Sequence, residues 1–116
     1  MRKFNKNNTK EAWKTHPDEK DVKAKIRPFK LLSLTKIPTA EEVGLDQMWN
    51  VFNYVLIDWK GIEDEDGPME CNEENKELVY NYDQEFVVFI INEAGKMRDA
   101  VISNKELKNS KPSQTG

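Results

Sequence analysis

Residues 59–67 read Trp-Lys-Gly-Ile-Glu-Asp-Glu-Asp-Gly and join an amphipathic pattern to an acidic turn. Before this stretch, large apolar residues recur at spacings of three and four. They are Met48, Trp49, Phe52, Val55, Leu56 and Trp59. This period predicts a helix that continues to Trp59. Because aromatic side chains remove much apolar surface from water, we expect this helix to form the centre of the core, with a partner-binding groove as the alternative role of Trp49 and Trp59.

The acidic turn partly matches an EF-hand calcium loop. Aligned on Gly67, it offers oxygen ligands at three of the four key positions. These are Asp64, Asp66 and Glu73. The first position is Ile62, whose side chain has no oxygen, and Pro68 takes the place whose carbonyl would bind the ion. We therefore predict a solvated turn with no metal or cofactor, and a calcium-dependent or hydrolytic module is only the third class of function considered.

The composition of the chain limits its number of domains, its partners and its compartment. A chain of 116 residues, with 34% charged and 37% hydrophobic residues, predicts one domain over residues 11–103 between flexible segments 1–10 and 104–116. A net charge of −3 disfavours a dedicated nucleic-acid binder. The single cysteine, Cys71, cannot form an internal disulfide, so a reducing cytoplasm is expected. No apolar run approaches the roughly 20 residues that span a bilayer, so no membrane is expected as a partner.

The first ordered element predicted is a β-hairpin. Residues 22–29 alternate between apolar and basic side chains, as in a half-buried strand, and residues 11–15 are placed to pair with them. The basic side carries Lys23, Lys25 and Arg27. We interpret this stripe as a solvated strand face or, alternatively, as an electrostatic docking surface.

Helices are predicted for the remainder. A short buried helix is expected from Phe29 to Ile37, and Thr39 with Glu42 forms a capping box for the next one. Asn72 is expected to cap a helix whose inward residues are Leu78, Val79 and Tyr82.

Asp83 is then expected to cap a last helix. Its inward face is predicted to carry Phe86, Val87, Ile90, Ile91, Ala94, Met97 and Val101. The run Phe-Val-Val-Phe-Ile-Ile over residues 86–91 also fits a buried strand, but the helical period continues beyond it and favours helix. Val88 and Phe89 would lie at the edge of the apolar face, where area remains for a partner.

Catalytic patterns are scarce. His16 is the single histidine and lies far along the chain from Cys71, whose acidic neighbours are expected to raise its pKa. The sequence has no glycine-rich phosphate loop and no paired-histidine metal motif. We therefore expect a protein that is not an enzyme.

The block Trp59-Lys60-Gly61-Ile62, followed by Asp64, Asp66-Gly67-Pro68 and Asn72-Glu73-Glu74-Asn75 before Leu78, resembles the small tail assembly chaperones of long-tailed bacteriophages. The resemblance spans residues 22–97. Cys71 and the long polar N-terminus depart from the family pattern.

This resemblance implies a protein that binds the tape measure protein and tail tube subunits during tail morphogenesis in the host cytoplasm, and that is absent from the mature virion. A structural head–tail or tail-completion protein retained in the virion is the alternative. The predicted partner-binding residues are Lys23, Lys25, Arg27, Val88 and Phe89, and a homo-oligomer is compatible with the sequence. The expected fold is α+β and mainly α-helical, with the N-terminal hairpin packed on three to four helices.

Overall fold

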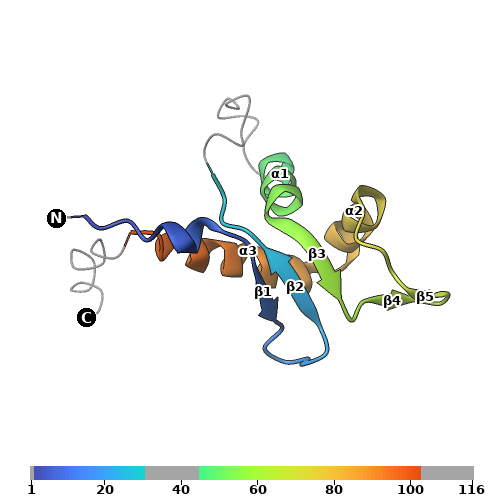
Figure 1. The fold of residues 1–116 in the computed structure, drawn as a ribbon. Coiled ribbons are helices and arrows are strands. Elements are labelled where there is room, and N and C mark those ends of the chain that lie inside the picture. The colour runs from blue at the N-terminus through green and yellow to red at the C-terminus, as the bar shows by residue number, and fades with distance from the viewer. Residues whose placement is uncertain (1, 31–44, 103–116) are drawn as a thin grey trace, which may run out of the picture.

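The computed structural model describes residues 2–30 and 45–102. In these residues the chain forms a small α+β fold with three α-helices and two antiparallel sheets (Figure 1). The strands are β1 (Ala12–Thr15), β2 (Lys23–Ile26), β3 (Leu56–Lys60), β4 (Glu63–Asp64) and β5 (Gly67–Pro68). The helices are the 3-10 turn η1 (Lys6–Thr9), α1 (Leu45–Val55), α2 (Glu73–Tyr82) and α3 (Gln84–Asp99).

The predicted hairpin is confirmed only in part. β1 and β2 pair antiparallel, with Trp13 opposite Lys25, but β2 is the central strand of a three-stranded sheet in the order β1-β2-β3. Its second neighbour, β3, lies about thirty residues further along the chain. The description as mainly α-helical is therefore wrong, because strands and helices share the core.

The central amphipathic helix is shorter than predicted. It ends at Val55, and Leu56 to Lys60 form β3 instead. The sheet supplies the physical reason, since β3 satisfies the backbone groups of β2, and the Arg27 amide donates to the Val55 carbonyl at 3.0 Å. A register irregularity between Lys25 and Ile26 allows Leu56 and Trp59 to be buried together, at the spacing of three that resembles a helical period.

The last helix is confirmed over Gln84–Asp99, but it ends before Val101, which was predicted to lie on its inward face. Residues 86–91 are helical within α3, and the Asp83 side chain caps it by accepting from the Phe86 amide at 3.1 Å. α3 contacts β2, α1, α2 and η1 and lies behind the three-stranded sheet in Figure 1. It is therefore the central element of the core, in place of the helix predicted to end at Trp59. The opposite face of that sheet carries none of the described helices.

The core joins one sheet face to the helices. Its buried apolar residues are Val22, Ala24, Ile26, Phe52, Val55, Leu56, Trp59, Val79, Phe86, Val87, Phe89, Ile90, Ala94 and Met97. The alternation predicted for residues 22–28 is confirmed, because Val22, Ala24 and Ile26 are buried while the intervening basic residues are half-buried.

The α2 prediction is confirmed at its start and corrected on its face. Asn72 accepts from the Asn75 amide at 2.8 Å, as expected of an N-cap. Val79 is buried, but Leu78 and Tyr82 are exposed. Tyr80 turns inward in their place, with ring centroids 5.2 Å from Trp49 and 5.4 Å from Phe52.

The N-terminal segment predicted to be flexible lies against the end of α3. Phe4 forms an isolated bridge with Ile102, and the Asn8 side chain donates to the Ala100 carbonyl at 2.8 Å. The capping box at Thr39, most of the predicted helix from Phe29 to Ile37 and the predicted C-terminal tail lie outside the described residues. Within the described residues, no helix is both long enough and apolar enough to cross a membrane.

Candidate functional site

The block over residues 59–78 folds as one connector between the sheet and the helices. The Trp59 indole N–H donates to the Met69 carbonyl at 2.8 Å, and the Met69 amide donates to the Ile62 carbonyl at 2.9 Å. Gly61 has φ +86°, and a Cβ there would collide with the Asp21 carbonyl. The tryptophan and the glycine of this block are thus required by the fold, with no chemical role needed to explain them.

The acidic turn is the tip of the β4–β5 hairpin. Glu65 and Asp66 form its two-residue turn, and the Asp64 carboxylate accepts from the Asp66 amide at 2.7 Å. Ile62, at the position where an EF-hand has its first ligand, is half-buried and packs against the core. Across residues 2–30 and 45–102, no group of three or more His, Cys, Asp or Glu side chains is arranged to hold a metal ion.

His16 and Cys71 have separate environments. His16 is buried at the β1–β2 connection, with its ring centroid 5.0 Å from that of Phe89, and its Nδ1 accepts from the Asp18 amide at 3.1 Å. Cys71 instead lies near Lys76 and Asp58. Each side chain therefore has a packing role in its own part of the fold.

Burial raises the pKa of the Cys71 thiol to about 11, with Lys76 opposing the rise and Asp58 adding to it. The predicted direction is confirmed, but desolvation rather than acidic neighbours is the main cause. Partial burial of the Lys76 ammonium likewise lowers its pKa, and its Nζ donates to the Asn53 carbonyl at 3.1 Å. A thiol held protonated at neutral pH is a poor nucleophile.

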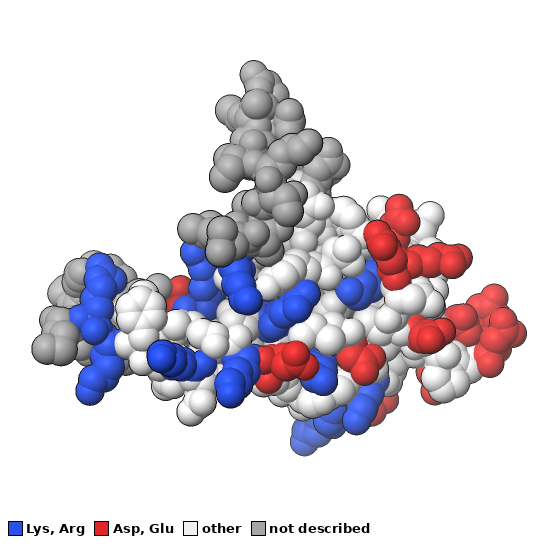
Figure 2. Space-filling model, turned by 45° about the horizontal axis from the view of Figure 1, so that its top comes forward, with Lys and Arg blue, Asp and Glu red and all other residues white. Residues whose placement is uncertain are grey.

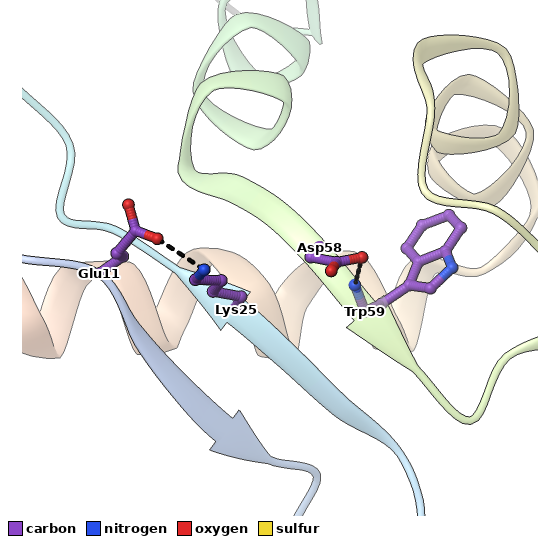
Figure 3. A network of polar contacts seen from close by, with 4 residues as sticks. All are labelled: Glu11, Lys25, Asp58 and Trp59. Carbon is purple, nitrogen blue, oxygen red and sulfur yellow. Dashed lines mark hydrogen bonds and ion pairs between the residues drawn. The ribbon is translucent and has the colours of Figure 1, made fainter.

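The basic stripe lies on the open face of the three-stranded sheet, but its members differ. Lys25 pairs with Glu11 at 2.9 Å and lies opposite Asp58 on β3 (Figure 3). Lys23 Nζ donates to the Lys20 carbonyl at 3.1 Å. Arg27 has a structural role, since its Nε donates to the Tyr54 carbonyl at 2.8 Å and its guanidinium lies 3.9 Å from the Tyr54 ring centroid.

The same face carries an aromatic residue that is not among the predicted partner-binding residues. Trp13 is 40% exposed, and Lys60 Nζ lies 4.7 Å from its ring centroid. The register places Trp13 opposite Lys25, so strand alternation is the signal that would have found it. Together, Trp13, Lys23, Lys25 and Lys60 form a partly exposed surface, here called the sheet surface.

The two apolar residues of α3 that were predicted to bind a partner, Val88 and Phe89, differ in their exposure. Val88 is 46% exposed, in agreement with its predicted place at the edge of the apolar face. Phe89 is only 7% exposed and packs on His16 and Phe86, so the prediction that it leaves area for a partner is wrong. The reason is tertiary, because the β1–β2 connection covers the side of α3 that carries Phe89.

Charge is strongly segregated along the molecule. Residues 2–30 contain ten Lys and Arg against four Asp and Glu, whereas residues 58–85 contain eleven Asp and Glu against two Lys. Figure 2 shows acidic side chains gathered at the end of the molecule formed by the β4–β5 hairpin and α2, with mainly basic ones, and a few acidic ones among them, across the rest of the described surface in that view. A small net charge therefore coexists with two local fields of opposite sign.

Comparison with protein-family models, curated proteins and solved structures found no match to the chain.

Proposed function

We propose that this chain is a tail assembly chaperone of long-tailed bacteriophages, which binds the tape measure protein and tail tube subunits in the host cytoplasm and leaves before the virion is complete. The observation that carries the proposal is the block over residues 59–78. Its residues resemble that family, and they fold as one connector in which Trp59, Gly61 and Asn72 each have a defined structural role. A block required by the fold is a suitable family signature.

The mechanism proposed is binding without chemistry. The sheet surface combines an exposed tryptophan with lysine side chains, and such a surface can hold an extended or helical client through aromatic contact and charge. Because the client must later be released, an interface that depends on solvent-exposed charges is appropriate, since these interactions are individually weak. No catalytic step is part of this proposal.

The structure refines the variants that test this surface. Lys23→Glu with Lys25→Glu reverses charge at two partly exposed positions, whereas Arg27 should be left intact because it bonds and stacks on Tyr54. The full chain and the double variant are each co-expressed with the tape measure protein of the same phage, and capture is measured at low and high salt. We expect the double variant to lose capture at low salt while its melting temperature changes little.

If neither the full chain nor the double variant captures the tape measure protein, the chaperone proposal is refuted. If the full chain and the double variant capture the tape measure protein equally well, the chaperone proposal stands but the sheet surface is not its docking site. Lys96→Glu is the matched control, because Lys96 is an exposed lysine on α3, outside the sheet. Mass spectrometry of purified virions provides a separate test, since abundant peptides from this chain would favour the alternative of a head–tail or tail-completion protein retained in the particle.

A further inference from the structure

The outer side of α2 is an unexpected apolar surface within an acidic field. Leu78 is 49% exposed and Tyr82 is 83% exposed. They are four residues apart, so they lie next to each other on one side of the helix. Their exposure follows from the orientation of α2 about its own axis, which places Val79 and Tyr80 toward the core.

Carboxylates flank this pair along the helix. Glu74 lies one turn before Leu78 on the same row, and Glu73 and Glu77 lie on the adjacent row. All three are exposed. The lysine of this helix, Lys76, turns inward to Asn53, and of these three carboxylates it interacts electrostatically with Glu73. We call Glu73, Glu74, Glu77, Leu78 and Tyr82 the α2 surface.

We propose that the α2 surface binds a basic amphipathic helix of a protein partner. Leu78 and Tyr82 would pack against the partner's apolar stripe, and the three glutamates would face Lys or Arg side chains that flank it. Charge complementarity selects this occupant, since an acidic or neutral helix would meet the acidic end of the molecule without compensation (Figure 2). Resting on the proposed function, this inference assigns a second client face and the chemistry of the segment that it receives.

The test uses the full chain and a synthetic probe. The probe is a 21-residue helical peptide with leucines at heptad a and d positions and lysines elsewhere, and a matched peptide replaces every lysine by glutamate. Titration at low salt is expected to give saturable binding of the lysine peptide and at least tenfold weaker binding of the glutamate peptide. Leu78→Ser with Tyr82→Ser, and separately Glu74→Lys with Glu77→Lys, should each weaken binding of the lysine peptide at least tenfold.

Met48→Ser is the matched control, since Met48 is an apolar residue on another helix, α1, with a similar exposure of 40%, and its replacement should leave binding unchanged. Circular dichroism of each variant checks that the fold is retained. Equal affinity of the α2 variants and the unmodified chain for the lysine peptide would overturn the inference. Self-association of the chain that the Leu78 and Tyr82 variant abolishes, without peptide binding, would assign the surface to a second copy and also overturn it.

The two proposals fail separately. Capture of tape measure protein that survives the α2 variants and is lost in the Lys23 and Lys25 variant would leave the proposed function standing and remove the α2 surface as a client face. If the chain binds the lysine peptide through the α2 surface but captures neither tape measure nor tube protein, the α2 surface remains a binding site for a basic helix and the proposed function is refuted.

Discussion

Replacing Trp59 by alanine tests the central packing argument of this fold. The side chain is 5% exposed, its ring lies 6.2 Å from that of Phe86 at an interplanar angle of 76°, and its indole N–H bonds the Met69 carbonyl. Truncation of a buried tryptophan typically costs about 3–5 kcal/mol in the free energy of unfolding. A domain of this size is stable by only about 5–15 kcal/mol, so Trp59→Ala should be severely destabilised or unfolded.

Urea unfolding followed by circular dichroism measures the effect. With an m-value of about 1–3 kcal/mol/M, the midpoint should fall by about 1 M or more. Trp59→Phe retains a ring against Phe86 but loses the hydrogen bond, so it should lose less stability, on the order of 1–2 kcal/mol. Trp13→Ala is the surface control, because Trp13 is 40% exposed, and should lose the least. A loss below about 1 kcal/mol for Trp59→Ala would refute the packing described for β3 and α3.

Three further changes test other parts of the structure. Gly61→Ala should destabilise the fold strongly, because φ is +86° and the new Cβ meets the Asp21 carbonyl; an unchanged melting temperature would contradict this. Asn72→Ala should cost about 1 kcal/mol in urea unfolding through loss of the α2 cap, with Asn92→Ala, at an exposed position within α3, as the control. At pH 8, iodoacetamide should alkylate Cys71 about tenfold more slowly in the native than in the unfolded chain, since a thiol pKa of about 11 lowers the thiolate fraction more than it raises nucleophilicity; equal rates would refute this.

The raised pKa of Cys71 also predicts the direction in which the stability of the fold changes with pH. The folded-state pKa of about 11 lies above the ordinary thiol pKa of 9.0, so the folded state retains the proton to higher pH than the unfolded chain. This contribution to stability is fully present below pH 9 and is lost as the pH rises toward 11. Cys71→Ala should therefore lessen the loss of stability between pH 9 and 11, as measured by urea unfolding, and an unchanged slope would contradict the shift.

Local chemistry in the sequence was sufficient for the caps and for the strand alternation. Asn72 and Asp83 accept the amide hydrogen bonds expected of them because a cap depends on residues three positions away. Residues 86–91 are helical as predicted because their period continues over four turns, far beyond the length of a strand. Alternation over residues 22–28 likewise depends only on the period of the strand itself.

Long-range pairing decided what the sequence alone could not. Leu56 and Trp59 fit a helical period, yet they belong to β3 because β2 requires a second partner for its backbone groups. The rotation of α2 depends on Tyr80 packing on Trp49 and Phe52, which exposes Leu78 and Tyr82. Phe89 is covered by His16 from a distant connection. Periodicity identifies apolar faces within one element, whereas only the packing of several elements determines which face is covered and which remains for a partner.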